Sequence, residues 1–196
     1  FFARGGHKLA DDIEDAIEER IGEEWERPTG SDVGRISHDS RAGDRYVDFL
    51  EGTLDTQLDG LRVVVDCANG AAFDVSPRAL ERAGAQVTAI HAQPNGWNIN
   101  DGCGSTYMES LVAAVRDGGA DVGIAHDGDA DRCLAVAADG SIIDGDHILA
   151  MLAMSKADSH TLAHGTVVST VMANLGFKIA MQDAGITVAE TAVGDR

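Results

Sequence analysis

VGIAHDGDADR, residues 122–132, joins an apolar strand pattern to a loop in which three aspartates alternate with small residues. The apolar residues at its start are typical of the end of a buried parallel strand. Three carboxylates placed directly after a strand repel one another unless something neutralises them. A hard divalent cation does so most simply, because Mg²⁺ and Ca²⁺ prefer oxygen ligands. The stretch therefore predicts a Mg²⁺ site at the carboxyl edge of a parallel sheet, with Asp127, Asp129 and Asp131 as candidate ligands.

Other interpretations of the same loop can be compared with this one. An EF-hand needs glycine at its sixth position and glutamate at its twelfth, where this chain has Arg132 and Ala138, so an EF-hand is excluded. A solvent-facing acidic turn capped by Arg132 remains an alternative, but the preceding strand favours the metal site. The planar guanidinium of Arg132 predicts a clamp for phosphate or carboxylate, because it binds oxyanions with two parallel hydrogen bonds.

Strand and helix patterns alternate through the rest of the chain. Strands are expected over residues 61–66, 86–91, 121–125, 166–170 and 187–192, with a hairpin over 133–143. Helices are expected over 71–83, 107–116, 144–156 and 173–184. Such alternation implies βαβ units with right-handed crossovers. The predicted fold class is α/β with a mixed, mostly parallel sheet.

The first 60 residues have a different pattern. One apolar residue in every four predicts an amphipathic helix, and the stripe consists of Leu9, Ile13, Ile17, Ile21 and Trp25. A polar loop over 31–43 and a short helix around 46–50 follow. We expect a domain boundary in the linker at 54–60 and a second one near Gly145.

Composition restricts the function. Of 196 residues, 44% are hydrophobic and the net charge is −18, which argues against nucleic acid and anionic membranes as partners. The three cysteines (Cys67, Cys103 and Cys133) lie far apart, so a zinc site or a disulfide framework is not expected. With no signal peptide or long apolar run, the sequence favours a cytoplasmic location. Because the chain starts at Phe1 without Met and stops just after a strand pattern, we expect a fragment of a longer protein.

Several polar segments are weaker candidates. Residues 66–72 could approach an anion through backbone N–H groups, but a tight strand-to-helix turn made by Asn69 and Gly70 is favoured. Ser105 and Thr106 are expected to cap the helix that follows. Residues 37–40, with the sequence SHDS, are interpreted as a surface loop rather than a catalytic dyad. The other histidines are scattered and predict no ligand set, and His126 should point away from the acidic loop.

The loop Asp127–Arg132 resembles the D-G-D-G-D-R metal loop of the α-D-phosphohexomutases. Several flanking segments are similar to the bacterial phosphoglucosamine mutase branch of that family. These segments are 64–71, 95–96 with 98–100, 103–106, 170–176 and 193–196. The resemblance runs in order over essentially the whole chain.

The resemblance implies four α/β domains of the phosphohexomutase type, of which this chain covers the end of domain 1 (1–55), domain 2 (56–145) and the start of domain 3 (146–196). It implies phosphoryl transfer between the 6- and 1-positions of glucosamine, through a phosphoserine that lies upstream of Phe1. Mg²⁺ would be held by Asp127, Asp129 and Asp131. Arg132, Asp195 and Arg196 would contact phosphate or substrate. A phosphosugar is the implied partner, and a homodimer is left open.

The chain also departs from the family pattern. Ala130 replaces the usual glycine and His126 the usual phenylalanine, and the S-A-S-H-N-P and G-E-x-S-G-H type segments are missing. We therefore expect little or no activity from the fragment and low metal occupancy without phosphate. Three rivals stay open: a phosphomannomutase or phosphoglucomutase, a phosphatase with Asp127 as nucleophile and Asp129 as acid–base, and a non-catalytic metal-binding module.

Overall fold

Most of the N-terminal helix is exposed, and only Glu14 and Ile17 are half-buried. The computed structural model describes residues 3–193, and the chain divides into two units, residues 1–39 and 40–196. In the first unit, α1 (Asp11–Ile21) buries none of its side chains, and Ile21 is 75% exposed. The helix is shorter than the apolar stripe predicts, because it begins at an acidic first turn and ends at Gly22, a poor helix former. A single 3₁₀ turn, η1 (Gly30–Asp32), follows.

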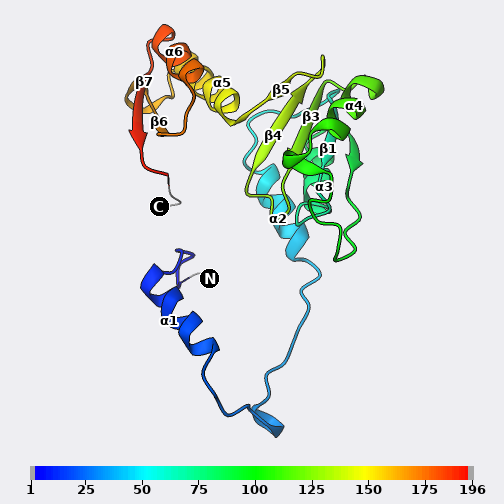
Figure 1. Cartoon of the computed structure of the whole chain (residues 1–196). Coiled ribbons are helices and arrows are strands. Elements are labelled where there is room, and N and C mark those ends of the chain that lie inside the picture. Colours follow the sequence, from blue (N-terminus) through cyan, green and yellow to red (C-terminus); the bar gives the residue numbers. More distant parts are fainter. Residues whose placement is uncertain (1–2, 194–196) are drawn as a thin grey trace. The chain divides into compact units, whose positions relative to one another are not determined.

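A five-stranded sheet forms the core of the second unit (Figure 1). Its strands are β1 (Arg62–Asp66), β2 (Gln86–Ile90), β3 (Val122–His126), β4 (Cys133–Ala137) and β5 (Ile142–Ile143). They lie in the order β2-β1-β3-β4-β5; β1 pairs in parallel with β2 and β3, and β4 pairs antiparallel with β3 and β5. The predicted mixed, mostly parallel α/β arrangement and the hairpin are confirmed.

Three helices accompany this sheet: α2 (Ala42–Glu51), α3 (Val75–Arg82) and α4 (Glu109–Gly118). α4 packs across β1, β3 and β4, whereas α3 packs against β2 and α2. The two crossovers run in opposite directions along the sheet, which puts α3 and α4 on opposite faces. The apolar core beneath α4 consists of Val64, Met108, Leu111, Val115, Ala120, Ala125 and Val136.

Two predicted helix starts are wrong. The helix expected from residue 71 begins at Val75, because residues 70–74 form a turn whose Ala71 N–H donates to Gly128 O at 2.8 Å. The helix expected from residue 107 begins at Glu109, and Ser105 and Thr106 lie in a separate 3₁₀ turn, η2 (Gly104–Thr106), so neither caps it. The first difference arises because the turn before α3 bonds the acidic loop instead of extending the helix.

A second, two-stranded sheet follows α5 (Gly145–Asp158). It pairs β6 (Thr166–Thr170) with β7 (Thr187–Thr191) in parallel, joined by α6 (Leu175–Asp183), with a 3₁₀ turn η3 (Ala163–Gly165) before β6. Side-chain caps begin both α-helices: Asp144 accepts from His147 N–H, and Asn174 accepts from Phe177 N–H. The core of this part is Ala153, Val167, Phe177, Met181 and Ile186. Within residues 3–193, no helix has the length and apolarity that a membrane crossing requires.

The order of the first sheet locates a natural binding position. From β1 the chain goes to β2 on one side, and β3 pairs with β1 on the other side, so the carboxyl ends of β1 and β3 mark a topological switch point. Asp66 and Ala125 are paired in register at these two ends. Ligands of open α/β sheets bind outside the carboxyl ends of strands at such a point. The loop after β3 is the predicted acidic loop.

Candidate functional site

The acidic loop, residues 127–132, brings three carboxylates together between β3 and β4. A carboxylate oxygen from each of Asp127, Asp129 and Asp131 lies within 4.8 Å of the other two. Asp127 is 2% exposed, whereas Asp129 and Asp131 are exposed to solvent. Ala130 adopts a left-handed conformation with φ of 61°, and its N–H donates to Asp127 O at 3.1 Å. This turn directs alternate side chains to one point, as the sequence predicts.

Close contacts fix the backbone of the loop at Gly128. Its carbonyl oxygen accepts the Ala71 N–H, and a Cβ added at Gly70 would overlap that oxygen. A Cβ on Gly128 itself would lie 2.7 Å from Asn100 Nδ2 and 2.8 Å from Ile99. Glycine is therefore needed at positions 70 and 128, because two segments of backbone lie in contact there. Of the two residues predicted to make this turn, Asn69 has a positive φ of 46°, but the second positive φ, 53°, belongs to Ala68 rather than to Gly70.

The three aspartates do not titrate alike. Burial alone raises the pKa of Asp127, but hydrogen bonds from the Arg132 side chain and backbone and from Asp131 outweigh it and lower that pKa. A hydrogen bond with Asp127 raises the pKa of Asp131, and burial and the charges of Asp129 and Asp127 raise it further. When carboxylates crowd one site and no cation lies between them, the pKa of one falls and the pKa of another rises in this way.

Arg132 is engaged within the loop itself. Its Nε lies 2.6 Å from Asp127 Oδ2 and 3.6 Å from Asp131 Oδ1, and its backbone N–H donates to Asp127 Oδ1 at 3.1 Å. Its side chain is 65% exposed. The structure thus places Arg132 against the carboxylates, and its predicted contact with phosphate stays a prediction. The other two predicted substrate contacts, Asp195 and Arg196, lie outside the described residues.

The donor set suits a hard divalent cation. All three side chains offer carboxylate oxygens without nitrogen or sulfur, and two of them face solvent, where a cation keeps its remaining water ligands. The raised pKa of Asp131 adds to this argument, because a cation relieves the repulsion that causes it. Asp127, Asp129 and Asp131 therefore fit a metal of the Mg²⁺ type.

His126 and the segment 37–40 take no part in this cluster. His126 Nε2 lies 2.8 Å from Ser76 Oγ of α3, and His126 Nδ1 is buried without a hydrogen-bond partner. The side chain points to α3 rather than joining the three carboxylates. Residues 37–40 are exposed and outside regular structure, except that Ser40 lies in the turn before α2.

Sequence reasoning missed one group beside the loop. Asp66 and Asp127 are the buried charged side chains among the described residues, and Asp66 pairs with His91 at 2.9 Å. His91, one of the scattered histidines, therefore has a carboxylate partner that its place in the sequence does not predict. Asp66 ends β1 and His91 directly follows β2, and these parallel strands are neighbours. Their carboxyl ends therefore lie at the same edge of the sheet, and this is the signal by which the pair could have been found.

Comparison with known proteins identifies two matching family models. One, described as phosphoglucomutase/phosphomannomutase, alpha/beta/alpha domain II, matches residues 44–140, and the corresponding domain III model matches residues 144–196. A solved structure of a phosphoglucomutase/phosphomannomutase family protein from Burkholderia thailandensis has a TM-score of 0.67 and 22% identity, and the match covers 78% of this chain and 33% of that one. This likeness supports the fold.

Three curated relatives carry the printed name phosphoglucosamine mutase. They come from Thermobifida fusca (59% identical over 196 residues), Acidothermus cellulolyticus (61% over 196) and Streptomyces griseus (60% over 201). Each match covers 100% of this chain but only 44%, 42% and 44% of the relative. The chain thus spans less than half the length of these relatives.

Proposed function

The chain belongs to the phosphoglucomutase/phosphomannomutase family, and from this membership we propose that it is part of a phosphoglucosamine mutase. The full-length enzyme would interconvert glucosamine 6-phosphate and glucosamine 1-phosphate by phosphoryl transfer. The observation that carries the proposal is identity of 59–61% along the whole chain with three proteins of that name. The substrate and the unpaired cysteines suit a cytoplasmic enzyme.

In this proposal the acidic loop is the Mg²⁺ site, held by Asp127, Asp129 and Asp131. The cation would neutralise the charge of a transferring phosphoryl group, which depends on electrostatics and positioning more than on covalent help from side chains. Asp127 supports this role because its pKa is lowered and Arg132 donates a hydrogen bond to each of its oxygens. Arg132, Asp195 and Arg196 are proposed contacts for phosphate or substrate, and the phosphoserine is proposed to lie upstream of Phe1.

The rival with Asp127 as a phosphatase nucleophile is less well supported. Both of its oxygens accept hydrogen bonds from Arg132, and the side chain is 2% exposed. These contacts hinder the approach of a phosphoryl group to Asp127, and the identity of 59–61% with three proteins named phosphoglucosamine mutase favours the mutase over this rival.

The test uses a protein of the relatives' full length that contains this chain. We expect Mg²⁺-dependent turnover of glucosamine 6-phosphate with a higher kcat/KM than for glucose or mannose 6-phosphate, and loss of at least about 100-fold in Asp129→Asn. The 196-residue chain alone is expected to show little or no turnover. Preference for glucose or mannose phosphate would transfer the proposal to a sibling mutase. An aspartyl-phosphate trapped on Asp127 would support the phosphatase instead.

A further inference from the structure

The carboxylate of Asp66, at the end of β1, joins three separate segments of the chain. It is fully buried. Its Oδ1 accepts the Ala68 N–H at 2.9 Å, and its Oδ2 accepts the Gly104 N–H at 3.0 Å and bonds His91 Nδ1 at 2.9 Å. Because an ionised carboxylate can only accept, Nδ1 of His91 carries the proton. The donors come from the turn after β1, the end of β2 and the start of η2.

Two of these segments contact the acidic loop directly. The turn after β1 continues to Ala71, whose N–H donates to Gly128 O at 2.8 Å. The segment that leads to Gly104 presents Ile99 and Asn100 to the other side of Gly128, and Asn100 N–H donates to Ala68 O at 2.9 Å. Gly128 lies between two of the aspartates. Displacement of either segment therefore changes the spacing of the carboxylates.

Asp66, His91 and Cys103 also lie close enough to resemble a metal site, with ligand atoms within 4.8 Å of one another. The hydrogen bonds argue against that use, because Asp66 is fully buried and its two oxygens already accept three hydrogen bonds. Burial and the charge of Asp66 raise the pKa of the Cys103 thiol, which keeps it protonated, whereas a metal ligand is a thiolate. The cluster is complete as a hydrogen-bonded support.

We propose that Asp66 is a positioning residue that sets the geometry of the acidic loop through the two segments clamping Gly128. The inference rests on the proposed function in one respect, since it takes Asp127, Asp129 and Asp131 as the metal ligands. Residues that orient metal ligands in this indirect way typically change metal affinity by about 10- to 100-fold when they are replaced.

The first test compares two substitutions of one kind in the 196-residue chain. Asp66→Asn keeps the shape but replaces one acceptor oxygen with a donor, so it breaks the support. Asp121→Asn is the matched control, because Asp121 also accepts a backbone N–H, from Arg62 at 2.8 Å, but precedes β3 at the opposite end of the strand. We expect Mn²⁺, titrated by electron paramagnetic resonance, to bind Asp66→Asn at least about 10-fold more weakly and the control like the parent chain. Equal affinity in folded samples of all three chains would overturn the proposal.

A second pair of variants separates positioning from charge, and serves if Asp66→Asn does not fold. His91 has φ of 48°, which asparagine and aspartate both tolerate. His91→Asn retains a donor for Asp66 and should keep near-parent Mn²⁺ affinity, whereas His91→Asp removes the donor and repels Asp66. The added negative charge by itself would strengthen cation binding, so weaker binding in His91→Asp supports positioning and stronger binding contradicts it.

A third measurement does not depend on metal. Hydrogen exchange at the Ala71 amide, which donates to Gly128 O, should accelerate at least about 10-fold in Asp66→Asn, while amides of α4 such as Val115 keep their parent rates. If the parent chain binds Mn²⁺ too weakly to titrate without phosphate, this exchange measurement still decides the role of Asp66. Unchanged Ala71 exchange would refute the positioning role even where the metal site holds.

Discussion

At the residue scale, repulsion among the carboxylates of the acidic loop lowers the stability of the fold when no cation is present. The pKa of Asp131 is raised above its ordinary value of 3.8 by its hydrogen bond with Asp127, by burial and by the neighbouring charges. The folded chain therefore holds this proton more tightly than the unfolded chain, and ionisation of Asp131 destabilises the fold as pH rises through that range. In the proposed metal site, the same crowded carboxylates would provide the affinity for the cation.

This conflict predicts the behaviour of Asp131→Asn. Without metal at pH 7, the variant should unfold about 1 to 2 °C higher than the parent chain, because its amide donates to Asp127 and carries no charge. The gain should disappear as pH falls below 3.8, where Asp131 is protonated in both states. Adding Mg²⁺ should raise the midpoint of the parent chain but not of the variant. Calorimetric scans across pH, with and without Mg²⁺, test all three points, and a lower midpoint at pH 7 would contradict the account.

Gly128 lies in the acidic loop and is tightly packed against the backbone and side chains of two other segments. Gly128→Ala should destabilise the chain by about 1 to 3 kcal/mol, because its Cβ would lie 2.8 Å from Ile99 and 2.7 Å from Asn100. Gly118→Ala is a suitable control, since an added Cβ there meets nothing within 4 Å. Urea unfolding of both variants provides the comparison. Equal stability of the two would show that the two neighbouring segments give way freely at Gly128.

Much of the candidate site was predictable from individual residues, and the reason is local. Asp127, Asp129 and Asp131 follow one another in a single loop, so the prediction that they cluster needs no tertiary information. The Asp66–His91 pair spans two strands, and its recognition requires knowing that β1 and β2 are neighbours in register. Sequence spacing carries no such information.

At the element scale, buried strands were easier to predict than helix starts. A continuous apolar run such as that of β1 has few alternatives, and its predicted and observed bounds differ by one residue. The start of α3 is displaced by four residues because the preceding turn bonds the acidic loop. Long-range backbone contacts thus override local helix propensity where the site is built.

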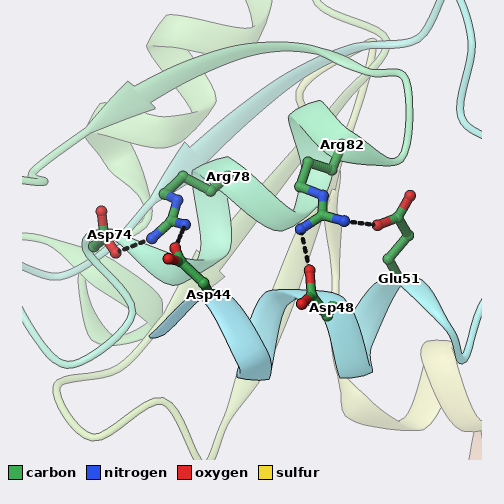
Figure 2. A network of polar contacts seen from close by, with 6 residues as sticks. All are labelled: Asp44, Asp48, Glu51, Asp74, Arg78 and Arg82. Atoms are coloured by element: carbon green, nitrogen blue, oxygen red, sulfur yellow. Dashed lines mark hydrogen bonds and ion pairs between the residues drawn. The ribbon is translucent and has the colours of Figure 1, made fainter. Parts of the chain in front are cut away.

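The attachment of α2 to α3 is another feature of this scale, and Figure 2 shows its polar contacts. Arg78 of α3 contacts Asp44 and Asp74, and Arg82, one turn later, contacts Asp48 and Glu51. Only Val47 of α2 is buried. Since exposed ion pairs are individually weak, the docking of this helix depends on several contacts that two arginines share.

This arrangement predicts a salt-dependent coupling between the helices. Arg82→Glu should lower the unfolding midpoint, because it faces Asp48 and Glu51 with a like charge, and adding Asp48→Arg should restore part of the loss. The coupling from the double-mutant cycle should shrink between about 0.05 M and about 0.5 M NaCl as charges are screened. Additive effects at low salt would mean that Val47 and its apolar neighbours hold the helix without the ion pairs.

At the scale of the whole molecule, the two units differ in how much of their surface they bury. The fold class followed from alternating strands and helices, because each βαβ unit needs its neighbour to cover its apolar face. The amphipathic stripe of α1 was equally clear in the sequence, but it predicts burial that the structure does not show. An amphipathic pattern shows that a helix has an apolar face that can pack, but it does not show whether another element covers that face.

Limited proteolysis should expose this difference between the units. Residues 21–39 are all exposed, and they contain Arg35. Trypsin should therefore cut after Arg35 before it cuts within the five-stranded sheet, where cleavage requires the core beneath α4 to open. Mass spectrometry over time should show a product that begins at Ile36 or later and retains the sheet. Its unfolding midpoint should match that of the parent chain to within about 2 °C, because α1 contributes no buried side chain. Faster cleavage after Arg62, within β1, or a much lower midpoint of the trimmed product, would mean that residues 3–39 stabilise the second unit.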